Sequence, residues 1–354
     1  MEGNLKMKKI LTTLCAVAML AGCTAGGSKK SSTNTSTKEE TAATVMVGTG
    51  SVTNVASKVN EGSDKEVKFD TTFASVVLEG DVIKYVYFDV AQDKVTFDAT
   101  GHVTSDNTAS TSKKALGDKY GMKDKSPIKK EWYEQVEALE KWAVGKTVEE
   151  VLNMPTTQKD EKHTVTADKD LMTGCTIGVT AFQQALDKAA KNAVEVKDVA
   201  SVGSAILTQV SGKDASAEKS SEAKASSTYG VVALDKDGKV VFTQTDEAQN
   251  AVKFTTAGVL DGEAAAVATK GEKKDEYGMK KASSIGKEWF EQNQAYDEWT
   301  VGKTAKEIAD MKVTTNEGGK TVTADKDLMT GCTMGVDSLQ KVTATAIAAA
   351  TKLN

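Results

Sequence analysis

Arginine is absent from this chain of 354 residues, in which all 45 basic side chains belong to lysine. A phosphate or carboxylate group therefore cannot be clamped by a bidentate guanidinium. Any phosphate on this protein must be held by lysine ammonium groups, by backbone N–H groups, by the start of a helix or by a covalent bond. The net charge of −5 also gives no electrostatic basis for binding nucleic acid, which requires a clustered basic surface.

Long apolar runs are scarce too, and the clearest one stands near the N-terminus. Lysines at positions 6, 8 and 9 precede the run "ILTTLCAVAMLAG", residues 10–22. This run is too short to span a bilayer, which takes about 20 residues, but it is typical of the core of a signal peptide. It ends in "LAGC", which resembles the lipobox of bacterial lipoproteins, where the cysteine is diacylated and becomes the mature N-terminus. We predict a lipoprotein signal peptide over residues 1–22 and lipidation of Cys23. An ordinary secretory signal with an incidental cysteine is the alternative.

Large apolar side chains are missing from residues 23–42, which are rich in Gly, Ser, Thr and Lys. Such a composition cannot bury enough surface to fold. We therefore expect a flexible tether, reaching on the order of 25 Å if about 20 residues follow random-coil scaling. The protein is then predicted to lie on the outer face of the cell membrane, anchored through Cys23.

The remaining chain consists of two halves related by an offset of 157 positions. The stretch "TVTADKDLMTGCT" occurs at Thr164–Thr176 and again, without a difference, at Thr321–Thr333. An offset this long indicates tandem duplication of a domain rather than a solenoid of short repeats. We place the two domains at residues 43–195 and 196–354. Further matches at the same offset are Tyr120 with Tyr277, Trp132 with Trp289, Trp142 with Trp299, and "VGKT" at Val144 with "VGKT" at Val301.

Each half is expected to place strands before helices. β-Branched and aromatic runs such as "VIKYVYFDV" predict strands. The segment "SPIKKEWYEQVEALEKWA" predicts a helix with Ser126 as its N-cap and Pro127 at its first position, and Ser283 takes the cap position in the second half. Short helices are predicted to begin at the capping boxes of Thr147 and Thr304. A strand-like "TVTAD", the rest of the repeated stretch and an alanine-rich helix close each half, so the fold class is α+β.

Histidine is nearly absent, and neither His102 nor His163 recurs at the matching position of the other half. Because a duplicated active site would be expected to keep its base, we expect neither a histidine triad nor a metal centre. The "GKT" sequences lack the first glycine of the Walker pattern, where Glu140 and Asp297 stand, so nucleotide hydrolysis is not expected.

Two cysteines, Cys175 and Cys332, occupy matching positions in separate halves. Each stands near an expected helix start, where the thiolate form is favoured, so a hydrolase that uses them as nucleophiles is one reading. Without a paired histidine we expect free thiols instead.

The repeated stretch is the strongest candidate for function. Its segment Thr173–Thr176 lies between an expected strand and an expected helix, where Gly174 permits a tight turn and the close approach of another molecule. The hydroxyl of Thr176 would then stand near a helix N-terminus, which favours a phosphate. A helix cap with a buried turn, copied by duplication, is the alternative. Caps tolerate Ser, Asp or Asn, however, and none of the thirteen residues differs.

The stretch resembles the D-x-x-(S/T)-G-A-(S/T) motif of FMN-binding domains, in which an ApbE-type flavin transferase joins FMN to the last Thr or Ser through a phosphodiester. The resemblance implies covalent FMN at Thr176 and Thr333. It departs from the family at Cys175 and Cys332, where alanine is usual. The matching residues are Asp170, Thr173, Gly174 and Thr176 in the first half and Asp327, Thr330, Gly331 and Thr333 in the second.

Together with the lipobox, two such domains resemble the flavolipoproteins of extracellular electron transfer in Gram-positive bacteria, over essentially the full mature chain. The resemblance implies an electron carrier, not an enzyme. It would accept electrons from a membrane NADH dehydrogenase or the quinone pool and release them to extracellular iron(III) or other acceptors. A covalent bond suits this location, because dissociated FMN would be diluted away. The alternative is a lipoprotein binding module that holds a noncovalent ligand or a cell-wall component in its two domains.

Two expectations concern the surroundings of the flavin. Asp170 and Asp327 would repel a phosphate, so we predict that they serve the metal-dependent attachment step of the transferase. The tryptophans are expected to anchor amphipathic helices. Stacking of one tryptophan, or of Tyr120 or Tyr277, on the flavin is the alternative.

Overall fold

The structure is a computed structural model that describes residues 44–58, 65–106, 109–161, 163–216, 219–255 and 259–353. The predicted signal peptide, Cys23 and the predicted tether lie outside the described residues. Residues 42–354 form one compact unit, so the two halves, 43–195 and 196–354, pack against each other. None of the helices within the described ranges is long and apolar enough to cross a membrane.

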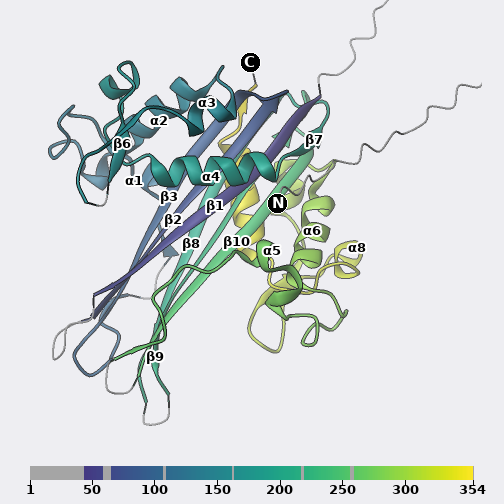
Figure 1. Cartoon of the computed structure of the whole chain (residues 1–354). Coiled ribbons are helices and arrows are strands. Elements are labelled where there is room, and N and C mark those ends of the chain that lie inside the picture. The colour runs from purple at the N-terminus through teal and green to yellow at the C-terminus, as the bar shows by residue number, and fades with distance from the viewer. Residues whose placement is uncertain are drawn as a thin grey trace, which may run out of the picture. The chain divides into compact units, whose positions relative to one another are not determined.

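Each half contributes one large antiparallel sheet and, beside it in the chain, one small sheet of two strands (Figure 1). The strand order is β3-β2-β1-β7 in the first sheet and β11-β10-β9-β8-β14 in the second, with β4 added beside β8. The strands of the first half are β1 Val45–Lys58, β2 Lys65–Glu79, β3 Val82–Phe97, β4 Ala109–Ser110, β5 Thr156–Gln158, β6 Thr164–Thr166 and β7 Val194–Val196. Those of the second half are β8 Ser201–Lys213, β9 Ser221–Leu234, β10 Val240–Phe254, β11 Leu260–Asp261, β12 Val313–Thr315, β13 Thr321–Thr323 and β14 Thr351–Lys352.

Helices follow the three long strands in both halves, as the sequence predicts. The mixture of strands and helices confirms the α+β class. The helices of the first half are α1 Lys113–Leu116, η1 Gly117–Tyr120, α2 Trp132–Ala143, α3 Val148–Leu152, η2 Leu171–Thr173 and α4 Thr180–Lys191. Those of the second half are α5 Lys270–Lys273, η3 Lys274–Tyr277, α6 Trp289–Thr300, α7 Ala305–Ala309, α8 Lys326–Met329 and α9 Asp337–Ala348.

Strand β2 shows how the layers are stacked. The side chains of Phe73 and Ser75 face the other sheet: the Phe73 ring centroid lies 5.0 Å from that of Tyr229, and the Ser75 hydroxyl lies 2.6 Å from that of Ser204. The alternate positions 74, 76 and 78 pack with helices α2, α3 and α4 in one hydrophobic core. Because successive side chains of a strand point to opposite faces, this part of β2 is covered on both sides.

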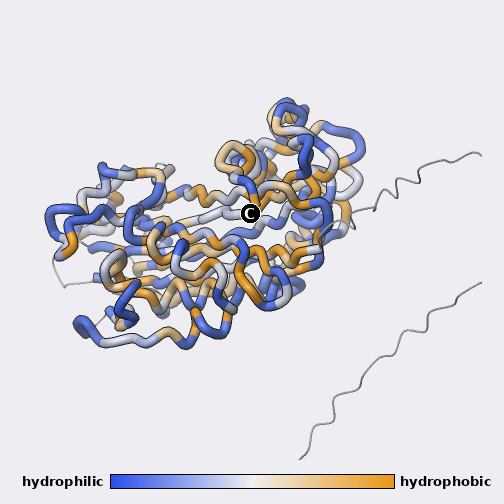
Figure 2. The backbone as a smooth tube through the Cα atoms, turned by 90° about the horizontal axis from the view of Figure 1, so that it is seen from above, coloured by the Kyte–Doolittle hydropathy of each residue, from blue (hydrophilic) through white to orange (hydrophobic). Residues whose placement is uncertain are grey.

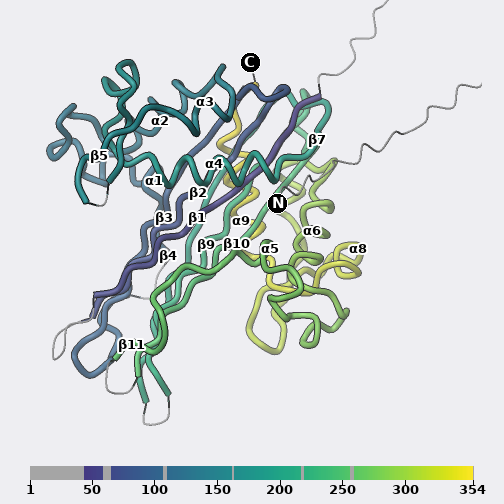
Figure 3. The backbone as a smooth tube through the Cα atoms, in the orientation of Figure 1, coloured from purple at the N-terminus to yellow at the C-terminus, as the bar shows by residue number. Residues whose placement is uncertain are grey.

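The second half repeats this layering, with α9 packed on β8 and β9. The two sheets face each other through apolar clusters drawn from both halves, and their long strands run side by side in Figure 3. At one such cluster the ring centroids of Phe97 and Phe254 are 5.4 Å apart. Figure 2 shows hydrophobic and hydrophilic segments alternating through the body of the protein, with hydrophilic segments frequent at its periphery.

The predicted starts of the two long helices are wrong. Helix α2 begins at Trp132 with Glu131 as its N-cap, and α6 begins at Trp289 with Glu288 as its N-cap. The carboxylate of Glu131 accepts hydrogen bonds from the amides of Met122 and Lys123, at 2.8 and 3.0 Å, and so ties the preceding loop to the helix start. Neither Ser126, Pro127 nor Ser283 belongs to a helix. The capping boxes predicted at Thr147 and Thr304 are confirmed.

Candidate functional site

The repeated stretch takes the same course in both halves. After β6, the Asp168 carboxylate accepts hydrogen bonds from the amides of Asp170 and Leu171, at 3.1 and 2.9 Å, and the Thr173 hydroxyl donates to the carbonyl of Asp170 at 2.8 Å. The matching side chain in the second half, Asp325, accepts the two equivalent amides at 3.1 Å each. These bonds are local, and they form the compact turn that presents the end of the stretch.

Gly174 and Gly331 are required by packing against the long helices. A Cβ atom placed on Gly174 would lie 2.7 Å from the Cβ of Ala138 in α2, and one on Gly331 would lie 2.6 Å from the Cβ of Ala295 in α6. Any side chain at Gly174 would therefore push the turn away from the helix. The backbone of Gly174, with φ −113° and ψ −24°, is open to any residue. The close approach that the sequence predicts for another molecule is thus made by the chain's own helix.

Thr176 is held by a glutamine that is fully buried. The Oε1 atom of Gln135 in α2 accepts hydrogen bonds from the Thr176 amide at 2.9 Å and from the Thr176 hydroxyl at 3.1 Å. The amide nitrogen of Gln135 donates to the Ser126 hydroxyl and to the carbonyl of Lys130, both at 3.1 Å. The Gln135 amide is therefore fully used, and it links the threonine to the loop that precedes α2.

The second half contains the same arrangement. Gln292 of α6 accepts hydrogen bonds from the Thr333 amide at 2.9 Å and the Thr333 hydroxyl at 3.4 Å, and it donates to the Ser283 hydroxyl at 3.0 Å. The hydroxyl of Ser284 also lies 3.3 Å from that of Thr333. The serines predicted to cap the helices therefore have another role, since they orient the glutamines that hold the two threonines.

The predicted placement of Thr176 beside a helix N-terminus is corrected. Helix α4 begins only at Thr180, its N-cap is Val179, and the Thr176 amide and hydroxyl point to Gln135 instead. Lysines supply the positive charge near the stretch. The ammonium of Lys159 donates to the carbonyl of Thr176 at 3.2 Å.

Another lysine near the stretch is present at matching positions of the two halves. The Nζ atoms of Lys130 and Lys287 each lie 3.9 Å from the position that a Cβ atom would take on Gly174 and Gly331, respectively. The two halves thus place an ammonium group at the same point beside the motif glycine.

The stretch divides into accessible and buried side chains. Asp170, Thr173, Asp327 and Thr330 are exposed, whereas Thr176 and Thr333 are half-buried. The cysteines are completely buried and free. Burial raises the pKa of Cys175 to about 11 and that of Cys332 to about 11, which disfavours the thiolate. These cysteines fill space in the hydrophobic core, and a nucleophilic role does not fit their surroundings.

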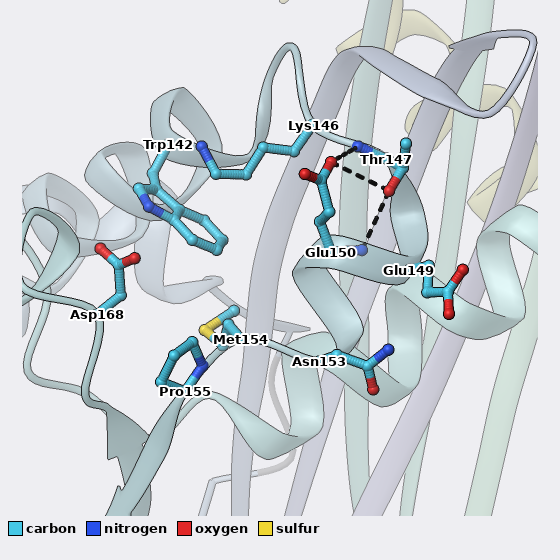
Figure 4. A pocket seen from close by; sticks show the side chains of 9 residues that line it. All are labelled: Trp142, Lys146, Thr147, Glu149, Glu150, Asn153, Met154, Pro155 and Asp168. Atoms are coloured by element: carbon cyan, nitrogen blue, oxygen red, sulfur yellow. Dashed lines mark hydrogen bonds between the residues drawn. The ribbon is translucent and has the colours of Figure 1, made fainter.

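The tryptophans fall into two groups. Trp132 and Trp289 are buried, as expected for side chains that anchor α2 and α6. Trp142 is half-buried and lines a shallow pocket of about 460 Å³ together with Asp168, shown in Figure 4. The ammonium of Lys146 lies 4.5 Å from the centroid of the Trp142 ring. Among the described residues that line this pocket, none is a predicted attachment residue.

Sequence reasoning missed Gln135, Gln292 and the paired lysines Lys130 and Lys287. All four recur at the same offset within "KEW(Y/F)EQ", and this match was a usable signal. Comparison of the chain with protein-family models, curated proteins and solved structures gives no match.

Proposed function

We propose that this chain is a surface flavolipoprotein that carries two covalent FMN groups, one on Thr176 and one on Thr333. It relays electrons from a membrane NADH dehydrogenase or quinol to extracellular acceptors such as iron(III). In this proposal the halves 43–195 and 196–354 are two homologous FMN-binding domains. An ApbE-type transferase attaches each flavin, and Cys23 carries the lipid that holds the protein at the outer face of the membrane.

The observation that carries the proposal is that the two threonines are held by equivalent hydrogen bonds in the two halves. In each half the backbone amide of the threonine donates to a buried glutamine at 2.9 Å, and the preceding glycine packs directly on the helix that bears the glutamine. A turn that served only to cap a helix would not need its glycine to pack against a second helix and its threonine to form hydrogen bonds with that helix. Fixing one hydroxyl in a set position is what a covalent attachment site requires.

The residues present are compatible with a phosphodiester. Thr176 and Thr333 are half-buried, which leaves part of each residue open to an external enzyme, and the exposed Asp170 and Asp327 stand six positions earlier in the chain. The ammonium groups of Lys130 and Lys287 are placed to offset the negative charge that a phosphodiester would bring. FMN, when bound, supplies one- and two-electron redox chemistry, while the protein supplies position and electrostatics.

The direct test is the intact mass, under denaturing conditions, of residues 24–354 produced together with an active flavin transferase. We expect two FMN additions in the unsubstituted protein, one in Thr176→Ala, one in Thr333→Ala and none in the double variant. Thr180→Ala is the matched control, because this exposed threonine begins α4 and lies outside the motif. It should keep both additions.

The rival binding module predicts a different result. Its protein would show an unmodified mass, or a yellow colour that is lost on denaturation. Either outcome, with the transferase shown to be active on another substrate, would overturn the attachment proposal. Asp170→Asn tests the part assigned to the aspartates: full flavin loading of this variant would exclude a role in attachment.

A further inference from the structure

The first half contains a buried lysine, Lys114, whose ammonium group lies between a carboxylate and an aromatic ring. The Nζ atom of Lys114 lies 2.6 Å from an oxygen of Glu140 and 3.8 Å from the centroid of the Tyr87 ring. The same Glu140 oxygen accepts the Phe88 amide at 2.6 Å. Both partners of the ion pair are largely buried, so the carboxylate and the ammonium compensate each other's loss of hydration.

The second half has a carboxylate at the position that matches Glu140 but no lysine at the position that matches Lys114. At the offset of 157 positions Glu140 corresponds to Asp297, Lys114 to Gly271 and Tyr87 to Gln244. Asp297 is 9% exposed and is held in place by Thr245, whose hydroxyl and amide lie 2.7 and 3.0 Å from its oxygens. Within the described ranges no lysine or histidine forms an ion pair with Asp297.

A cavity of about 630 Å³ lies at this place. Its lining includes Gly271 and Asp297, where the first half has the lysine and its glutamate, as well as Trp289 and Phe290. A cavity of this size is typical of a small-molecule site. From the first half, Thr49 also lines the cavity, and its amide donates to the Gln244 side chain at 2.7 Å. The cavity is therefore built from both halves.

Acidic side chains dominate the described lining of the cavity. Asp246, Glu272, Asp297 and Glu298 line it, against Lys274 as its one lining cation within the described residues. Glu272 is neutralised by Lys188 at 2.6 Å, but the Asp297 carboxyl has no cationic partner among the described residues, and its hydrogen-bond donors are the neutral Thr245 and Asn293. Desolvation raises the pKa of the Asp297 carboxyl well above its usual value, and a cation bound beside it would favour the ionised form. No group of three or more described His, Cys, Asp and Glu side chains is arranged to hold a metal ion, so an organic cation is the better match.

We propose that this cavity binds an alkylamine through its primary ammonium group, with Asp297 as the anionic partner and the aromatic side chains around the alkyl portion. The ligand's ammonium takes the role that the Lys114 side chain has in the first half. The inference does not depend on flavin attachment, because neither Thr176 nor Thr333 lines the cavity.

The test uses n-butylamine, which reproduces the lysine side chain beyond Cα, titrated calorimetrically into residues 24–354 at neutral pH. We expect one molecule of n-butylamine to bind saturably. Its affinity should be at least tenfold weaker in Asp297→Asn, and n-butanol should not bind. Asp310→Asn, which alters an exposed aspartate of the second half, should bind as the unsubstituted protein does.

Gly271→Lys gives an independent check, because it restores the internal ammonium and should abolish binding of n-butylamine. The amide bond at this position is the same in both halves, since the Lys114 amide donates to Asp89 at 3.0 Å and the Gly271 amide to Asp246 at 2.9 Å. A Cβ atom on Gly271 would lie 2.8 Å from an Asp246 oxygen, so the Asp246 side chain has to shift to admit the lysine, and the variant is informative only as a folded protein. The absence of saturable binding, or unchanged affinity in folded Asp297→Asn and Gly271→Lys proteins, would overturn the proposal.

Discussion

At the scale of single residues, the chain places two threonine hydroxyls with a small set of partners. Gln135 and Gln292 fix the threonine amides, and Ser126 and Ser283 fix the glutamines. A buried amide that has lost its acceptor lowers the free energy of unfolding. Because each hydrogen bond in this series fixes the partner of the next, the series as a whole restricts the loop more strongly than one bond would.

Replacing Gln135 by leucine keeps most of the volume and removes the acceptor of the Thr176 amide. We expect a loss of about 1–3 kcal/mol in the free energy of unfolding, because a buried donor is left unsatisfied. Flavin loading at Thr176 should fall while loading at Thr333 is kept. Chemical denaturation and intact mass measure the two effects. Gln294→Leu alters an exposed glutamine of α6 and should change neither quantity.

Gly174→Ala tests the contact between the turn and α2. The new methyl group would lie 2.7 Å from the Cβ of Ala138, and overpacking of this kind typically costs about 1–3 kcal/mol. Removing the opposing methyl group in Gly174→Ala/Ala138→Gly should recover part of the stability, less about 1 kcal/mol for glycine within a helix. A single variant as stable as the unsubstituted protein would refute this account of the glycine.

At the scale of secondary structure elements, the sequence predicts the order of strands and helices but not where the long helices begin. Ser126 followed by Pro127 is a typical N-terminal signal. It was overridden because Glu131 accepts two amides of the preceding loop and forms a reciprocal capping box with Glu134. Hydrogen bonds between residues eight or nine positions apart lie outside the four-residue pattern by which a helix start is recognised. The capping box at Thr147 is a wholly local arrangement, and it was predicted correctly.

The start of α2 can be tested by comparing two substitutions. Glu131→Ala should reduce the free energy of unfolding by about 1–3 kcal/mol, because two loop amides lose a buried acceptor. Pro127→Ala should change it by less than about 1 kcal/mol, since the residue lies outside the helix. The reverse ranking, measured by chemical denaturation, would support a helix that begins at Pro127.

At the scale of the whole molecule, the two halves share one interior, and several carboxyl groups are enclosed in it. Asp93 of β3 is 1% exposed and accepts a hydrogen bond from the Ser110 hydroxyl of β4, the strand that pairs with β8. Desolvation raises the pKa of Asp93 to about 6. The packing of one sheet on the other was beyond prediction from the sequence, because it depends on which face of each strand the partner sheet covers. The predicted boundaries of the two halves are compatible with this shared interior.

The raised pKa of Asp93 has a consequence for stability. Between the ordinary pKa of an aspartate and about 6, the folded protein binds more protons at this site than the unfolded chain does. The contribution of Asp93 to the free energy of unfolding therefore falls as the pH rises through this window. Asp93→Asn should gain stability relative to the unsubstituted protein between pH 4 and 7, by up to about 3 kcal/mol. A difference that stays constant with pH in denaturant titrations would contradict this assignment.

The most direct test of the account is to locate the flavin on the chain. Cleavage after lysine releases peptides 170–188 and 327–341, which differ in sequence and contain one candidate threonine pair each. After production with an active flavin transferase, tandem mass spectrometry should find one FMN phosphodiester on Thr176 and one on Thr333, with Thr173 and Thr330 unmodified. Unmodified peptides, or flavin on any other residue, would contradict the claim that the repeated stretch is a pair of attachment sites.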